Sequence, residues 1–282
     1  MKQRSIKQVA SAIREDIDDL ITRRALPTHQ VRIVDPFLFL NHHGPQTYPS
    51  PNHGLPFGPH PHRGFETVTF ILEGDIAHRD SGGHESVINA GGVQWMTAGD
   101  GLIHEEVSSE EFMKKGGPLE ILQLWVNLPA KLKRTKPNYR GLQAPDIPKI
   151  KTDDGKVTVE VVSGSWLGEK GAFEPLVDIQ CQLLHLKSSA QLDLTVSAPR
   201  NIFFYVVRGS VTVNGQTAER FQLIEFNNDG DTLRVNAEED AVILFAHADP
   251  FNEPVISHGP FVMNTKAEII EAIEDYQAGK FG

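Results

Sequence analysis

Hydrophobic and polar residues alternate in short runs along most of this chain, and turns rich in glycine separate the runs. Residues 67–72, 93–96 and 121–128 are typical runs of this kind. Short apolar runs at this spacing, with glycine turns between them, indicate antiparallel strands of a β-sandwich or barrel. The strands do not alternate with long helical patterns, which argues against a parallel α/β sheet. The pattern therefore predicts an all-β protein.

The strand pattern occurs twice along the chain. Residues 70–76 (FILEGDI) and 205–211 (YVVRGSV) share an apolar run, a glycine and a second short run. Gly74 and Gly209 stand at equivalent positions, where each pair of strands must turn tightly. This weak internal repeat predicts two barrels in tandem.

The two halves are separated by residues 129–156, which are rich in Pro, Lys and Asp. Near the end of the chain, Thr265 and Glu268 have the spacing of a capping box and precede a broad apolar stripe, which predicts a helix at 266–277. We expect an N-terminal domain at 1–135, a linker at 136–156, and a C-terminal domain at 157–282 that ends in the helix.

Three segments near the N-terminus have weaker patterns. Residues 10–23 have some helical character but no clear cap or stripe, so their structure stays open. Residues 31–40 predict a strand that is interrupted at Pro36. Residues 42–61 are dense in Pro, Gly, His and Asn, which predicts a loop.

Composition excludes several classes of protein. The net charge is −10 and the only basic cluster is at residues 131–136, so we expect no direct nucleic-acid partner. No run approaches the roughly 18 apolar residues that a membrane span needs, and residues 1–26 have no apolar run of signal-peptide length. We therefore expect a cytoplasmic protein with no membrane partner. Cys181 is the single cysteine, so no internal disulfide forms, and its alternating position suggests a buried structural thiol.

The most informative polar residues are His60, His62, His104 and Glu106, which form two pairs of spacing i, i+2. Residues two apart on a strand point to the same face, so each pair presents both groups to one side. An isolated His-x-His pair is commonly structural, but nine of the twelve histidines lie before residue 105. If both strands face one barrel interior, three imidazoles and a carboxylate form a site suited to iron, manganese, nickel or copper. Glu66 lies four residues after His62, and on one continuous strand this even spacing would place it on the same face as His60 and His62.

The second half of the chain lacks this constellation. The repeat aligns Thr195, Ser197, Glu239 and Ala241 with the four candidate ligands, so we expect one metal per chain. The sequence has no H-E-x-x-H, G-x-S-x-G, P-loop or G-x-G-x-x-G motif, so zincin, triad and nucleotide chemistry have no support.

With these residues assembled, the chain resembles the pirin family of the cupin superfamily, and the resemblance covers nearly all of it. The sequence departs from the usual family pattern at residues 41–44 (NHHG), beside the expected pocket. The most specific segments are residues 35–38 (DPFL), 60–69 (HPHRGFETVT), 78–81 (HRDS), 94–99 (QWMTAG), 104–106 (HEE), 253–255 (EPV), 259–265 (GPFVMNT) and 275–282 (DYQAGKFG).

The resemblance implies two cupin barrels (double-stranded β-helices, or jelly rolls) and one metal in the N-terminal barrel. The metal is usually Fe²⁺, with Mn, Ni, Co, Cu or Zn as alternatives. By motif position the ligands are His60, His62, His104 and Glu106. Generic cupins take the carboxylate of the first motif instead, here Glu66, which we keep as an alternative close to the metal. Both carboxylates are candidates for the catalytic base.

The resemblance also implies two functions. The first is quercetin 2,3-dioxygenase activity, in which a small flavonol-like aromatic substrate reacts with O₂. The alternative is a non-catalytic, metal-dependent co-regulator that acts through a protein partner. The residues themselves show no partner surface, so the dioxygenase is the first hypothesis.

Overall fold

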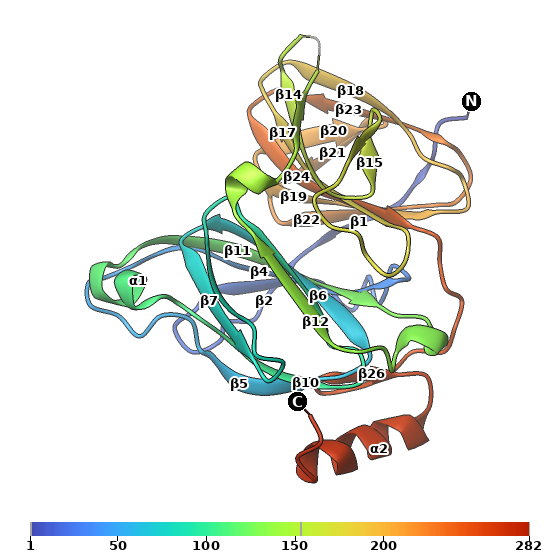
Figure 1. Ribbon diagram of the computed structural model, residues 1–282. Coiled ribbons are helices and arrows are strands. Elements are labelled where there is room, and N and C mark those ends of the chain that lie inside the picture. Colours follow the sequence, from blue (N-terminus) through green and yellow to red (C-terminus); the bar gives the residue numbers. More distant parts are fainter. Residues whose placement is uncertain (1, 153, 282) are drawn as a thin grey trace. The chain divides into compact units, whose positions relative to one another are not determined.

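The computed structural model describes residues 2–152 and 154–281, and these form two compact units (Figure 1). We call them the N-unit and the C-unit, after the half of the sequence that supplies most of each. The N-unit comprises the described parts of Arg14–Arg24, Phe37–Asp146 and Phe251–Gly282, and the C-unit those of Met1–Ile13, Ala25–Pro36 and Ile147–Pro250.

The N-unit is built on two antiparallel sheets. One sheet has seven strands in the order β12-β9-β6-β11-β4-β3-β2, and the other has four in the order β5-β10-β7-β8. Its elements are β2 (Ile13–Arg14), β3 (Thr22–Leu26), β4 (Phe37–Tyr48), β5 (Phe57–His62), β6 (Phe65–Glu73), β7 (Asp75–Asp80), β8 (Glu85–Asn89), β9 (Val93–Thr97), β10 (Leu102–Val107), α1 (Glu110–Lys115), β11 (Gly117–Asn127), the 3₁₀ turns Ala130–Leu132 and Ala144–Asp146, β12 (Asn138–Leu142), β25 (Ile256–His258), β26 (Phe261–Met263) and α2 (Lys266–Gln277).

The C-unit repeats this architecture. It has a seven-stranded sheet in the order β1-β22-β19-β24-β17-β14-β13, a four-stranded sheet in the order β18-β23-β20-β21, and the small pair β15-β16. The prediction of two β-barrels in tandem is confirmed. The strands are β1 (Ile6–Ser11), β13 (Lys149–Lys151), β14 (Val157–Ser163), β15 (Ser165–Trp166), β16 (Glu169–Lys170), β17 (Ile179–Leu186), β18 (Ala190–Thr195), β19 (Asn201–Arg208), β20 (Ser210–Val213), β21 (Gln216–Glu219), β22 (Gln222–Phe226), β23 (Thr232–Ala237) and β24 (Ala241–Ala248).

The terminal segments do not follow the expected domain boundaries of 1–135 and 157–282. Strand β1 pairs with β22 of the C-unit, whereas β25, β26 and α2 belong to the N-unit. The expected linker at 136–156 contains β12 and β13, which are edge strands. An edge strand buries few side chains, and β12 buries only Tyr139. Its sequence therefore lacks the alternation that would have identified a strand.

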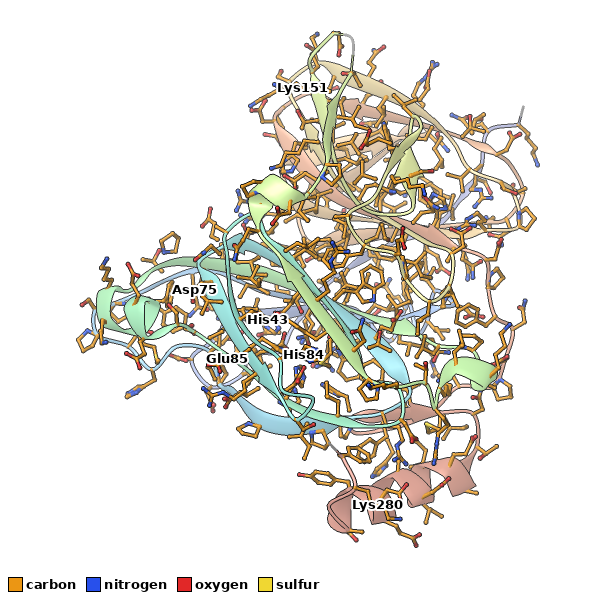
Figure 2. All side chains as sticks on the ribbon, viewed as in Figure 1. His43, Asp75, His84, Glu85, Lys151 and Lys280 are labelled. Atoms are coloured by element: carbon orange, nitrogen blue, oxygen red, sulfur yellow. The ribbon has the colours of Figure 1, made fainter. Side chains whose placement is uncertain are left out.

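The expected loop at 42–61 also begins as a strand, because β4 continues to Tyr48. His42 and His43 lie on opposite faces of β4, and both are buried (Figure 2 labels His43). The Nε2 atom of His42 is 3.0 Å from Glu120, and the Nδ1 atom of His43 is 2.9 Å from the hydroxyl of Thr22. Because these polar side chains are buried and paired, the strand can contain histidines that in the sequence look typical of a loop.

The C-unit has an apolar interior. Thr195 and Ser197, which the repeat aligned with His60 and His62, are exposed to solvent. Among the described residues, the one group of three or more potential metal ligands lies in the N-unit. The interior of the C-unit is filled by a cluster that includes Val159, Leu184, Phe204, Val235 and Ile243.

Helix α2 spans the predicted residues, and the capping box between Thr265 and Glu268 is present. The buried residues Ile269 and Ala272 pack with Met263 and neighbouring apolar side chains of the same unit. The helix therefore covers an apolar surface of the N-unit. Within the described chain, no helix is long and apolar enough to cross a membrane.

Candidate metal centre

Three imidazoles of the N-unit converge on one point. His60 and His62 come from β5 and His104 from β10, and His104 stands directly opposite His60 in the antiparallel pair. The potential ligand atoms of the three side chains all lie within 4.8 Å of one another. The spacing of the first pair and the register of the two strands together bring the rings to one face, as the sequence predicted.

The hydrogen bonds of the rings leave nitrogen lone pairs free for a metal. The Nδ1 atom of His60 lies 2.7 Å from the carbonyl oxygen of Gly58, and that of His62 lies 3.3 Å from the carbonyl oxygen of Pro260. A carbonyl oxygen only accepts, so Nδ1 carries the proton in both rings and Nε2 is unprotonated. His104 is buried, and neither of its ring nitrogens has a hydrogen-bond partner in the described structure.

Burial keeps these imidazoles neutral. It lowers the pKa of His62 to about 3, with the neighbouring His60 as a smaller cause. Burial also lowers the pKa of His60 and of His104, and the other rings contribute further at His104. The neutral ring is the form that binds a metal. The three rings are neutral, and His104 has no hydrogen-bond partner for either ring nitrogen in the described structure. These properties fit a site for a divalent transition metal.

Glu106 lies on the same strand as His104 but has other partners. The pairing of β10 with β5 is irregular between His104 and Glu106. The carboxylate is buried and accepts hydrogen bonds from Gln123 Nε2 at 2.6 Å, from Thr69 Oγ1 at 3.3 Å and from Gln94 Nε2. Burial outweighs these bonds and raises the pKa of Glu106 to about 7. Its oxygens lie outside the tight group that the three imidazoles form.

Glu66 lies on the face of β6 opposite to Thr69, whereas its even spacing from His62 predicts a place on the side of the imidazoles. Thr69, three residues later, points toward Glu106, and alternation along the strand directs Glu66 to the other side. There the hydroxyl of Thr97, its cross-strand neighbour, donates to Glu66 at 2.6 Å. The alternation of faces does not continue from β5 into β6, because Gly64, with φ of +89°, separates the two strands and they belong to different sheets.

A polar network that the residue pattern did not predict lies behind Glu106. The hydroxyl of Tyr139 donates to Gln94 Oε1 at 3.0 Å, which turns the amide nitrogen of Gln94 toward Glu106. Ser86 lies 2.6 Å from the same hydroxyl, and the ring of Tyr139 stacks on His78 at 3.8 Å. Gln94 belongs to a characteristic segment of the sequence, but Tyr139 lay in the expected linker and had no signal.

Aromatic rings adjoin the imidazoles. The ring of Trp125 lies 5.3 Å from that of His62, 4.4 Å from Phe65 and 4.6 Å from Phe39. The indole nitrogen of Trp125 is 3.4 Å from the side chain of Gln123, which also contacts Glu106. An aromatic wall therefore stands beside the polar groups of the barrel interior.

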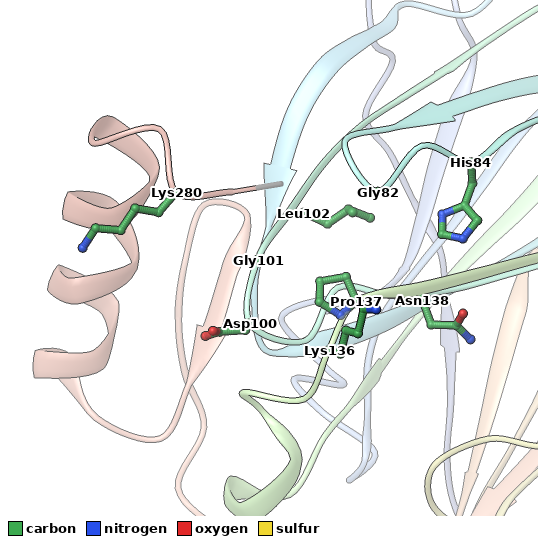
Figure 3. A pocket seen from close by; sticks show the side chains of 9 residues that line it. All are labelled: Gly82, His84, Asp100, Gly101, Leu102, Lys136, Pro137, Asn138 and Lys280. Carbon is green, nitrogen blue, oxygen red and sulfur yellow. The ribbon is translucent and has the colours of Figure 1, made fainter.

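A separate open pocket of about 600 Å³ lies on the surface of the N-unit. Asp100 and Lys280 mark its end near α2, and His84 and Asn138 lie toward the other end (Figure 3). None of the three clustered imidazoles lines this pocket. It is therefore distinct from the candidate metal centre.

Comparison with known proteins identifies the family. The chain matches the Pirin family over residues 19–126 and the Pirin C-terminal cupin domain over residues 182–282. A pirin-like protein of Caulobacter vibrioides is 39% identical over 262 residues, which cover 92% of this chain and 91% of that protein.

Solved structures agree with this match. The crystal structure of quercetin 2,3-dioxygenase from Acinetobacter baumannii is 36% identical, with a TM-score of 0.92 and coverage of 100% of this chain and 99% of that one. The bacterial pirin YhhW from Escherichia coli, solved in complex with nickel(II), has the same fold, with a TM-score of 0.68 at 21% identity; the match covers 86% of this chain and 99% of that one. With its two cupin domains and its histidine cluster, this chain belongs to the pirin family.

Proposed function

We propose that this chain is a metal-dependent dioxygenase of flavonol-like substrates, of the quercetin 2,3-dioxygenase type. The observation that carries the proposal is the convergence of three neutral imidazoles within 4.8 Å in the N-unit. The relative of 36% identity over the whole chain is a quercetin 2,3-dioxygenase, which supports the same chemistry here.

His60, His62 and His104 would hold the metal, with Glu106 as the fourth ligand. Nitrogen and carboxylate donors suit Fe²⁺, which we propose as the occupant, and also Mn, Co, Ni, Cu or Zn. Thiolate ligation has no source, because the single cysteine, Cys181, is buried in the C-unit. A bound metal would supply Lewis-acid stabilisation of a substrate oxyanion and a redox partner for O₂.

Glu106 is also the proposed base for the substrate hydroxyl. Its carboxylate is buried in the same barrel as the three imidazoles, within the polar site where a substrate hydroxyl would lose its proton. The donors Gln94, Gln123 and Thr69 hold it in place. Glu66 faces the other side of β6, so it has no part in this step.

The aromatic wall would orient the substrate. The ring of Trp125 stacks on Phe39, lies 4.4 Å from the buried ring of Phe65, and meets His62 edge-on. Aromatic rings prefer offset or edge-on contacts with one another, so the partly exposed ring of Trp125 offers such a contact to a planar flavonol ring. These side chains would also keep water away from the reacting oxygen.

An aerobic assay with quercetin tests the proposal. Protein loaded with Fe²⁺ should cause an oxygen-dependent loss of the visible absorbance of quercetin. His60→Ala should lose both the metal and this activity. His185→Ala, which alters a partly exposed histidine of the C-unit, should keep both. Metal-loaded protein that leaves quercetin unchanged would contradict the dioxygenase and favour the non-catalytic alternative.

A further inference from the structure

We propose that residues 260–281, here called the C-terminal clasp, are a positioning element of the metal centre. The clasp holds His62 in its metal-binding orientation, so docking of the clasp and binding of the metal strengthen each other. This inference rests on the metal site of the proposed function. The clasp comprises β26, α2 and the residues that follow α2, and it lies beside β5 and β10 in the N-unit (Figure 1).

The first connection is a backbone contact to the ligand itself. The carbonyl oxygen of Pro260 accepts the Nδ1 proton of His62 at 3.3 Å. The same oxygen accepts the backbone N–H of Arg63 at 3.4 Å, and the N–H of Val262 donates to the carbonyl of Arg63 at 3.0 Å. Arg63 and Phe261 form a parallel bridge. The clasp therefore sets both the tautomer of His62 and the path of the chain just beyond it.

The second connection is a buried charge that α2 neutralises. Arg63 is 2% exposed, and its guanidinium donates to Asp275 at 2.8 Å and to the carbonyl of Asp100 at 2.6 Å. The guanidinium also lies 4.6 Å from the centre of the Phe281 ring. A buried cation that loses its anionic partner is strongly unfavourable. If the clasp undocks, Arg63 must move toward water. Because Arg63 follows His62 directly in the chain, this movement disturbs the position of His62.

The third connection is a buried lysine that bridges the clasp and the turn after the ligands. The Nζ atom of Lys133 is buried and donates to the carbonyls of Gly64 at 2.9 Å and Val262 at 3.0 Å, and to Asn127 at 2.6 Å. A Cβ atom on Gly64 would lie 2.0 Å from the Val262 carbonyl oxygen. The turn and the clasp therefore fit together closely, with space only for glycine.

These contacts make a thermodynamic link. Partners that orient a histidine ligand typically change metal affinity by about 10–100-fold when they are removed. Coupling between two binding events is reciprocal, so whatever the clasp adds to metal affinity, the metal adds to docking of the clasp. A clasp that only covered apolar surface would be stabilised by the metal no more than the rest of the N-unit, because a ligand of the folded state stabilises the whole unit.

Substitution of Asp275 tests the first direction of this link. Asp275→Asn keeps the shape of the side chain but removes the nearer of the two anions beside Arg63, since Asp100 Oδ1 lies 3.8 Å away; it also removes the ion pair with Lys280. Glu271→Gln is the matched control, because Glu271 lies on the same helix and pairs with Arg134 in an exposed ion pair. Each metal-free protein is titrated with Co²⁺, followed by its visible absorption bands. Asp275 acts on His62 through Arg63, so we expect Asp275→Asn to bind Co²⁺ on the order of tenfold more weakly with shifted bands, and Glu271→Gln to match the wild type.

Hydrogen exchange of the wild-type protein tests the reverse direction. Saturation with Co²⁺ should slow the exchange of amides of residues 266–281 more than that of amides of β8, which belongs to the same unit. A folded Asp275→Asn protein with unchanged Co²⁺ affinity and bands would overturn the inference, and so would exchange at 266–281 that Co²⁺ slows no more than at β8. If Asp275→Asn does not fold, the wild-type exchange decides. Neither readout uses quercetin, so a protein without dioxygenase activity can still show the link, whereas failure to bind Co²⁺ would sink both proposals.

Discussion

Replacement of Glu66 by glutamine tests the placement of this carboxylate away from the metal. Glu66 is 1% exposed and lies on the face of β6 opposite to Thr69 and Glu106. Burial raises its pKa from 4.5 to about 7 and outweighs the hydrogen bonds from Thr97 and Trp95. Glutamine has nearly the same shape but does not titrate, so the variant removes this ionisation and little else.

The sign and size of the effect follow from linkage. The native protein binds the Glu66 proton more tightly than the unfolded chain, whose pKa is near 4.5. The contribution of Glu66 to stability is therefore fully present below pH 4.5 and is lost as the pH rises through about 7. A difference of about 2.5 pKa units, at ~1.4 kcal/mol each, corresponds to ~3 kcal/mol. Relative to wild type, Glu66→Gln should gain about this much stability between acidic and mildly alkaline pH.

Denaturant unfolding of the metal-free proteins at about pH 5 and about pH 8 measures this difference. Glu85→Gln, which alters an exposed carboxylate of the same unit, should follow the wild type at both values. Glu66→Gln should also keep full metal content, because Glu66 lies on the face of β6 opposite to Thr69 and Glu106. Parallel pH dependence of the variant and the wild type would refute the raised pKa, and loss of the metal would refute the placement.

Three further outcomes are expected. Glu106→Gln should weaken Co²⁺ binding at least about tenfold in a titration, because it replaces an anion by an amide that faces other amide donors; unchanged affinity would remove Glu106 from the ligand set. Gly64→Ala should lower the free energy of unfolding by at least about 2 kcal/mol, since φ is +89° and the new methyl group meets a backbone carbonyl; a stability equal to wild type would show that the turn relaxes. Burial raises the pKa of the Cys181 thiol, so it should react with a thiol reagent only after unfolding, and rapid labelling of the native protein would contradict its burial.

The sequence alone determined the features that depend on local spacing. Alternation of apolar and polar residues predicted an all-β protein with two barrels, and the capping box between Thr265 and Glu268 predicted the bounds of α2. The i, i+2 spacing of His60 and His62 predicted that their rings share a face. Such predictions hold because strand alternation and helix capping act between residues a few positions apart.

Only the tertiary structure decided the relations between distant segments. Residues at even spacing share a face only along one continuous strand. The turn at Gly64 carries the chain into another sheet, so the spacing of His62 and Glu66 could not show where Glu66 lies. Tyr139 lies on an edge strand that the sequence suggested was a linker. The carbonyl of Pro260 reaches His62 across almost 200 positions of the chain, and a backbone group leaves no trace in the side-chain pattern. Contacts of this kind arise when the barrel closes, so residue types and spacing do not encode them in any one segment.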